Sequence, residues 1–416
     1  MPKTKGGLQK VSNTKSGLAN KDSKPRVRLT YEGREVNEYY LAAKLRYRSA
    51  KWITFVLLIA FLLFNLIFFR ENITYANMMY LLRDLDTGSY TVSGEFAGAT
   101  YSEESNMMFD IYKGKMALAA SSGFSIFNTA GSREFEDNTY MQNPRLECGE
   151  KYAIAYDMGG NVYGIFNSMG KVMSGTSDFT IEDCAVSDTG RFALLTRSGE
   201  SKYLVTVYND KLKAEVKYYR DSYVVDMAMD SSGKTLVMAA AKITGSGIAC
   251  EIMLAEKGKE ETETLTIANS MPLAIEYMKD GGILVFCEDR VVSLEGKKVA
   301  NEYVFSSGKP AMFDYSDEGL AVLCSTNAVG TDNEFYVFDS KAKNVYSGEI
   351  SEKVNKIALD NDNTVYLLCD AKIEKRTEDA KKYTCKTDEK VIDILAYYGS
   401  LIRCEAKGAF VCEFKD

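Results

Sequence analysis

One kind of turn recurs along most of the chain, and each copy precedes a short, strongly apolar segment. Asp or Ser near the start of such a turn bonds its own backbone, and Gly or Asn at its end supplies a positive φ. The segments that follow are rich in aliphatic and β-branched residues, which predicts strands. The clearest turns are Ser187–Gly190, Asp230–Gly233, Lys279–Gly282, Ser316–Gly319 and Asp360–Asn363.

The spacing of these turns predicts the fold class. With shorter versions ending at Gly114, Glu150 and Gly399, the turn ends lie 36 to 49 residues apart. A repeat of about 40–50 residues is the period of a four-stranded propeller blade. The prediction is therefore an all-β protein in which residues 88–416 form an eight-bladed β-propeller. Seven blades are the alternative, because the period at 140–175 is the weakest.

The strand count predicts how the ring closes. The last period supplies three strands and then the chain stops, whereas SYTVSGEFA at 89–97 is a surplus strand before the first period. We expect strand 89–97 to pair with 409–415 and complete the eighth blade, which covers two sheet edges that would otherwise be exposed.

A second feature is the apolar run Trp52–Phe69, in which sixteen of eighteen residues are apolar or aromatic and none is charged. A run of this length predicts a membrane-spanning helix. Residues 1–51 hold thirteen Lys or Arg and four Asp or Glu, which predicts that the N-terminus is cytoplasmic and the body lies outside. A cleaved signal peptide is the alternative. The predicted segments are a disordered basic tail (1–36), a juxtamembrane and transmembrane helix (37–70) and a stalk helix (71–87).

Composition excludes several classes of function. The chain has no His and carries a net charge of −7, which removes the commonest general base and makes nucleic acid an unexpected partner. We predict no cofactor and no enzyme activity. The nine Cys form no C-x-x-C pair; we interpret most of them as small core residues. A reactive thiol and some disulfides remain alternatives, and the best disulfide candidate is Cys404 with Cys412, across a predicted hairpin.

The turn between the first two strands of each period resembles that of the propeller superfamily that includes WD40-like, TolB-like and quinoprotein-like repeats. The layout of basic tail, one membrane helix and propeller resembles uncharacterised single-pass envelope proteins of Gram-positive bacteria, a domain of unknown function. The chain lacks the W-D dipeptide of WD40 repeats, the repeated Trp of quinoproteins, the sialidase box and the G-x-S-x-G elbow. The resemblance therefore implies a fold and a location, not an activity.

Acidic residues recur on one face of the predicted innermost strands. They share that face by the two-residue strand period, so we expect them to point into one central channel. Carboxylates that repel one another can have raised pKa values or bind a cation. A solvated polar channel is the alternative. The candidates are Asp183, Asp226, Glu276, Asp314 and Asp393, with Lys356 in the same ring.

Two connections between second and third strands are extended, at 242–247 and 327–333. Loops on a rigid scaffold are common binding sites, although ordinary variation in loop length is the alternative. The candidates on this face are Thr244, Ser246, Asn327, Thr331, Asp332 and Asn333.

Together these features predict a protein-binding or scaffolding module of the cell envelope. It would contact membrane lipid through 52–69 and the basic tail, and an envelope protein through the propeller. The alternatives are a propeller enzyme, or a sensor that binds a cation or a sugar through the channel carboxylates.

Overall fold

The computed structural model describes residues 9–10, 29–31, 34–35, 38–68 and 96–415, except 246, 260, 307 and 388. The chain divides into two compact units, Met1–Thr87 and Gly88–Asp416. The predicted stalk helix at 71–87 and most of the predicted strand at 89–97 lie outside the described residues.

The first unit contains one long helix, α1 (Glu38–Phe68). Its stretch Arg46–Phe64 is long and apolar enough to cross a membrane, and it overlaps the predicted span 52–69. Within the predicted tail, three short strands form an antiparallel sheet: β1 (Gln9–Lys10), β2 (Leu29–Tyr31) and β3 (Arg34–Glu35). The rest of 1–36 lies outside the described residues.

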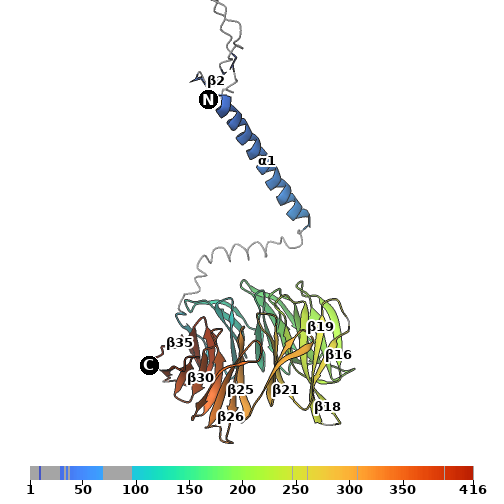
Figure 1. The fold of residues 1–416 in the computed structure, drawn as a ribbon, viewed down its shortest axis with the longest axis vertical. Coiled ribbons are helices and arrows are strands. Elements are labelled where there is room, and N and C mark those ends of the chain that lie inside the picture. Colours follow the sequence, from blue (N-terminus) through green and yellow to red (C-terminus); the bar gives the residue numbers. More distant parts are fainter. Residues whose placement is uncertain are drawn as a thin grey trace, which may run out of the picture. The chain divides into compact units, whose positions relative to one another are not determined.

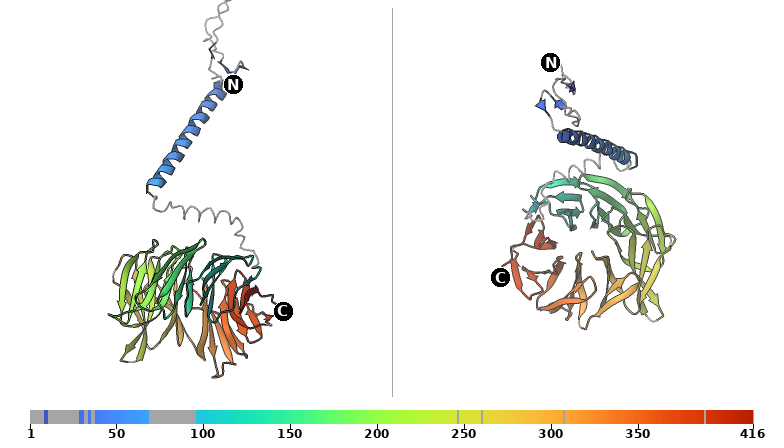
Figure 2. Two further views of the ribbon diagram at one scale, coloured as in Figure 1. Left: turned by 180° about the vertical axis from the view of Figure 1, so that it is seen from behind. Right: turned by 45° about the horizontal axis from the view of Figure 1, so that its top comes forward.

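The second unit is an eight-bladed propeller, as the turn spacing predicts. Eight four-stranded antiparallel sheets surround a central axis, which Figure 2 shows in its right-hand view. Blades 1 to 4 are β5–β8 (Met107–Tyr112, Lys115–Ala120, Gly123–Phe127, Arg133–Asp137), β9–β12 (Pro144–Cys148, Ala153–Asp157, Val162–Asn167, Gly170–Thr176), β13–β16 (Ile181–Val186, Phe192–Arg197, Tyr203–Tyr208, Ala214–Arg220) and β17–β20 (Tyr223–Met229, Thr235–Thr244, Gly247–Glu256, Glu263–Ile267). Blades 5 to 7 are β21–β24 (Pro272–Tyr277, Ile283–Cys287, Arg290–Glu295, Lys298–Val304), β25–β28 (Lys309–Tyr315, Gly319–Ser325, Asn333–Asp339, Asn344–Ile350) and β29–β32 (Val354–Leu359, Val365–Cys369, Lys372–Arg376, Lys382–Lys386).

Blade 8 is built from both ends of the propeller. Its order is β33 (Val391–Tyr397), β34 (Ser400–Glu405), β35 (Gly408–Val411) and β4 (Ala99–Thr100). The pairing with β35 is made by Ala99 and Thr100, opposite Ala409 and Gly408, rather than by the predicted 89–97. The side chain of Tyr101 reinforces this closure, because its hydroxyl donates to the backbone oxygens of Glu405 and Gly408 at 2.9 and 2.8 Å.

The apolar core lies between the blades. Among the described residues, eight apolar clusters each combine side chains from two neighbouring blades, including one between blades 8 and 1. Consecutive side chains of a strand point to opposite faces, so each blade packs against both neighbours. Cys287, Cys324 and Cys369 are all buried in these clusters, as predicted for most of the nine Cys.

Candidate functional site

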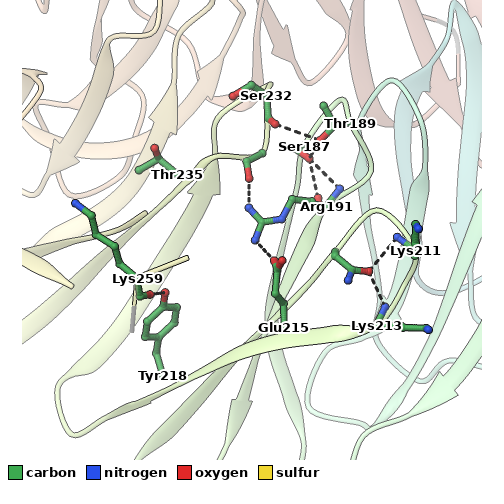
Figure 3. A network of polar contacts seen from close by, with 12 residues as sticks. Ser187, Thr189, Arg191, Lys211, Lys213, Glu215, Tyr218, Ser232, Thr235 and Lys259 are labelled. Atoms are coloured by element: carbon green, nitrogen blue, oxygen red, sulfur yellow. Dashed lines mark hydrogen bonds and ion pairs between the residues drawn. The ribbon is translucent and has the colours of Figure 1, made fainter. Parts of the chain in front are cut away.

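The recurring turns contact one another around the ring. In the turn of blade 3, the hydroxyl of Thr189 donates to the carbonyl of Ser232 in the turn of blade 4 (3.3 Å). The buried guanidinium of Arg191 donates to the carbonyl of Gly233 and pairs with Glu215, as Figure 3 shows. Gly233 has φ +68°, and a Cβ there would lie 2.8 Å from the Thr189 hydroxyl oxygen, so this close approach requires glycine.

Hydrogen bonds also join the turn regions of six other pairs of neighbouring blades. They run from Tyr112 to Lys151, Glu150 to Asp188, Lys279 to Asp317, Asn361 to Asp317, Gly399 to Asp360, and Tyr397 to Gly114. The last of these contacts links blade 8 to blade 1. On the turn face, polar contacts therefore link seven of the eight pairs of neighbouring blades.

The inner strands of blades 3 to 8 share a backbone irregularity. Each has a register shift near its start, for example between Ile181 and Asp183 in β13 and between Val224 and Asp226 in β17. A β-bulge adds one residue to a strand and re-aims the side chains that follow it. Asp183, Asp226, Lys356 and Asp393 directly follow such bulges.

The inner carboxyl groups are bonded to backbone. Five of them accept a hydrogen bond from the N–H of the next residue, at 2.6 to 3.0 Å: Asp110, Asp183, Asp226, Glu276 and Asp393. Asp226 and a sixth group, Asp314, also accept a hydrogen bond from a neighbouring blade: Asp226 from the N–H of Ile275 and Asp314 from that of Leu359, both at 2.8 Å. Lys356 forms an ion pair with Asp393 across blades 7 and 8 (3.3 Å).

A cavity of about 630 Å³ opens among the inner strand ends on the turn face. Glu276 and Asp314, two of the predicted channel residues, line it together with Asp110 and Glu147. The hydroxyl of Tyr315, also in the lining, is buried and has no hydrogen-bond partner among the described residues. Asp183, Asp226, Asp393 and Lys356 lie on the inner strands but do not line this cavity.

Asp110 and Glu147 were not among the predicted residues, although each stands on the first strand of its period. The inner strands of blades 1 and 2, MMFDIY and PRLEC, pair without the register shift of the later blades. The carboxyl groups of Asp110 and Glu147 therefore do not occupy the strand position that Asp183 and Asp226 occupy in the later blades. Counting back from the turn ends at Gly114 and Glu150 to the preceding inner strand could have located them.

Burial changes the acidity of these groups. It raises the pKa of Asp110 to about 6, that of Asp314 to about 7 and that of Glu276 to about 8. Burial, reinforced by the charge of Asp183, raises the pKa of Glu147 well above its usual range. Several of the groups are therefore protonated near neutral pH and can donate hydrogen bonds. Among the described residues, no group of three or more metal-binding side chains is arranged to hold an ion.

The predicted loop candidates lie on the opposite face. The hydroxyl of Thr244 donates to the carbonyl of Gly247 (2.9 Å), and Ser246 is outside the described residues. The amide of Asn327 donates to Thr331 and Asp332 within its own loop, at 3.0 and 2.9 Å. Asn333 is buried and donates to the carbonyls of Gly330 and Glu352. These polar groups shape the loops from within.

Large apolar side chains are strongly exposed at these loops. Ile243, at the tip of the β18–β19 hairpin, is 77% exposed, and Val329, between β26 and β27, is 75% exposed. Ile248 faces Ile243 across the hairpin. In Figure 1 the hairpins of β18 and β26 both lie at the lower rim of the propeller. The prediction of polar binding residues in these loops overlooked the two apolar side chains, which stand beside the predicted residues in the sequence.

All nine Cys are free thiols in the structure. Cys404 lies opposite Ala409 rather than opposite Cys412, because the β34–β35 turn is shorter than a Cys404–Cys412 pairing requires. The thiol of Cys412 instead contacts that of Cys385 in blade 7.

Solved structures with a similar fold include a chain of the Kuenenia stuttgartiensis hydrazine synthase (13% identity, TM-score 0.42, 55% of this chain and 74% of that chain). A chain of a mitotic checkpoint complex is also similar (10% identity, TM-score 0.47, 70% of this chain and 90% of that chain). At these identities and scores, neither chain bears on function.

A comparison with curated proteins gave no match. Residues 87–402 match a family described as a family of unknown function (DUF5711). That match covers all eight turns and most of the propeller. The chain belongs to the DUF5711 family.

Proposed function

We propose that this chain is a membrane-anchored binding module, whose propeller lies outside the cytoplasm and binds a protein of the cell envelope. Helix α1 supports the anchor, because Arg46–Phe64 is long and apolar enough to span a bilayer. The cations before Trp52, including Lys44, Arg48 and Lys51, support a cytoplasmic N-terminus.

The bonding of the inner carboxyl groups favours binding over catalysis. Asp226 and Asp314 are engaged by backbone N–H groups of neighbouring blades, so their first role is to hold the ring together. A rigid ring with loops at its rim is the usual arrangement of a binding scaffold.

The observation that carries the proposal is the exposure of Ile243 and Val329 at hairpin tips on one rim. Apolar side chains gain by leaving water, and fully buried aliphatic side chains are worth about 1.5–3 kcal/mol each. A protein surface with matching apolar pockets would bury both tips and leave the polar loop groups at the periphery.

The test is chemical crosslinking of the tagged full-length chain in its native membranes, followed by identification of the crosslinked protein. The Ile243→Asp, Val329→Asp double variant should lose that product. Val299→Asp is the matched control, because Val299 is exposed on the outer strand β24 beside the β23–β24 turn, at the opposite end of the blade. Equal crosslinking of the double variant and the control contradicts the proposal.

A second candidate function rests on the cavity of the turn face. Carboxyl groups held neutral by burial, together with the unpaired Tyr315 hydroxyl, suit a polyhydroxylated ligand such as a sugar. Thermal shift assays compare the melting temperature of the chain with neutral sugars and with Ca²⁺. They distinguish a sugar-binding cavity from a cation-binding one. A shift with a sugar that disappears in Glu276→Gln supports this function, and no shift with any of them removes it.

A further inference from the structure

The end of the chain leaves blade 8 and joins blade 7. Cys412 still bonds to β34, because its N–H donates to the carbonyl of Leu401 (2.8 Å). Three residues later, Lys415 pairs with Thr384 of β32 through two backbone hydrogen bonds of 2.9 and 3.0 Å. The last residues therefore tie the ring-closing blade to its neighbour.

This path brings two cysteines together. Cys385 of β32 and Cys412 belong to the same apolar cluster between blades 7 and 8, and they are 4% and 6% exposed. Their proximity follows from the backbone, because Thr384, next to Cys385, pairs with Lys415, three residues beyond Cys412. The guanidinium of Arg403 lies on the other side of Cys385, with Nη1 3.9 Å from its sulfur.

Cys385 lines a cavity of about 580 Å³. The walls of this cavity also include Lys386, Arg403 and Lys415, with Glu413 as the acidic member. An excess of cations around a thiol stabilises the thiolate, which is the reactive form.

A second cysteine pair provides a contrast. Cys250 and Cys287 belong to one apolar cluster between blades 4 and 5, and both are fully buried at 0% exposure. The pKa of Cys287 is also lowered, chiefly by Cys250, with Arg290 among the causes. What distinguishes Cys385 is its place in the wall of a cavity.

The acidities of the two thiols differ in the direction that exchange chemistry needs. The hydrogen bond from Cys412, together with Arg403, lowers the pKa of Cys385 to about 6, although burial opposes the shift. The same hydrogen bond, with burial, raises the pKa of Cys412. Both shifts favour the thiolate form of Cys385 and the protonated form of Cys412.

We propose that Cys385 and Cys412 form a thiol–disulfide exchange site, which accepts a small-molecule disulfide and locks the end of the chain onto blade 7. The Cys385 thiolate attacks one sulfur of the small disulfide, forms a mixed disulfide and releases one small thiolate. Cys412 then loses its proton and attacks the Cys385 sulfur, and the second small thiolate leaves. The two protein thiols are oxidised to one disulfide, and the small disulfide is reduced to two thiols.

The inference goes beyond the proposed binding function and does not depend on it. An extracytoplasmic location would favour the oxidised state, since disulfides persist in oxidising compartments. The lock would act where the closure is short, because β4 contributes only Ala99 and Thr100 to blade 8.

The experiment uses the full-length chain in detergent, fully reduced and then treated with oxidised glutathione. The intact mass should fall by two hydrogens. After tryptic digestion without reduction, residues 383–386 should be linked to 408–415, whereas Cys404 falls in the separate peptide 404–407. Linkage of Cys412 to Cys404, or no linkage of Cys385, overturns the proposal.

Variants separate the two roles. Cys412→Ser should accumulate a stable mixed disulfide between glutathione and Cys385, because the resolving thiol is missing, and Cys385→Ser should form neither product. The double variant Cys250→Ser, Cys287→Ser is the control and should react as the native chain does. A control that loses the reaction, or a Cys412→Ser variant without the adduct, contradicts the assignment.

Arg403 is the positioning residue. Arg403→Gln should slow the alkylation of Cys385 by iodoacetamide roughly tenfold at neutral pH and move its pH profile upward. If this variant does not fold, the pH profile of the native chain decides: half-maximal alkylation near pH 6 supports the site, and an inflection above pH 8 overturns it.

Discussion

The carboxyl group of Asp226 accepts a hydrogen bond from the backbone N–H of Ile275, with Oδ2 and N 2.8 Å apart. The two residues stand on the inner strands of neighbouring blades, which belong to different sheets. Asp314 and Leu359 form the same contact between blades 6 and 7. Inner strands of neighbouring blades belong to separate sheets and are not paired with each other. At these two places an acidic side chain supplies a hydrogen bond between them.

The first prediction concerns this contact. Asp314→Ala leaves the N–H of Leu359 without its acceptor, and an unsatisfied buried donor costs about 1–3 kcal/mol. Urea unfolding of the propeller near pH 6 should show a loss of this size in the free energy of unfolding. Asp178→Ala, at an exposed position of the β12–β13 connection, is the control and should change stability little. Equal losses in the two variants would remove the role given to Asp314.

The second prediction is the pH dependence of stability. Burial raises the folded-state pKa values of Asp110, Asp314 and Glu276 to about 6, 7 and 8. In the unfolded chain these groups titrate near pH 4, so between these limits the folded state binds more protons. Their contribution to stability is fully present below about pH 4 and is lost as pH rises through the folded values.

The propeller should therefore melt at a higher temperature at about pH 5.5 than at about pH 8.5. Glu276→Gln keeps the carbonyl acceptor for the N–H of Tyr277 and removes the titration, so it should flatten this dependence. The exposed Glu318→Gln is the control. A melting temperature that rises steadily over this range would show that the inner carboxyl groups titrate normally.

The third prediction concerns the contact between the turns of blades 3 and 4. Arg191→Met removes the donor to the Gly233 carbonyl and the partner of Glu215 (Figure 3). Hydrogen bonds to charged groups contribute about 1.5–3 kcal/mol, so unfolding should become easier by that order. Arg133→Met is the matched control, because Arg133 lies on the exposed strand β8. If both variants unfold at the same urea concentration as the native chain, the contacts between these turns do not stabilise the fold.

The fourth prediction concerns ring closure. Tyr101→Phe keeps the ring packing and removes both hydrogen bonds to the β34–β35 turn. The two carbonyl oxygens share the single hydroxyl proton, and one hydrogen bond contributes about 0.5–1.5 kcal/mol, so the whole propeller should lose about that much stability. Tyr140→Phe, at an exposed position, should have little effect. Fraying of blade 8 alone, with unchanged global unfolding in hydrogen exchange, would contradict this account.

The sequence was sufficient to predict eight blades because turn chemistry is local. Ser187–Gly190 and its equivalents carry their own bonding groups, so their spacing gives the period without any tertiary information. The common face of Glu276 and Asp314 also follows from local strand geometry.

Contacts between blades could not be predicted in the same way. The partner of Cys412 is Cys385 because the chain crosses to blade 7, a path fixed by the pairing of Lys415 with Thr384. The closing strand lies at Ala99–Thr100 because Tyr101 is held by the turn after β34. Each of these contacts joins residues that are distant in sequence. The repeat period of the turns gives no information about which distant residues meet.

The most direct test of the proposed anchored module is the accessibility of a peptide tag placed after Asp416. In sealed cells, with the wall removed where one is present, a membrane-impermeant antibody or protease should reach this tag, while a tag before Met1 should be protected until the membrane is opened. The protein should also stay in the membrane fraction after carbonate extraction. A C-terminal tag that becomes accessible only after lysis, or release of the chain by carbonate, would contradict the account.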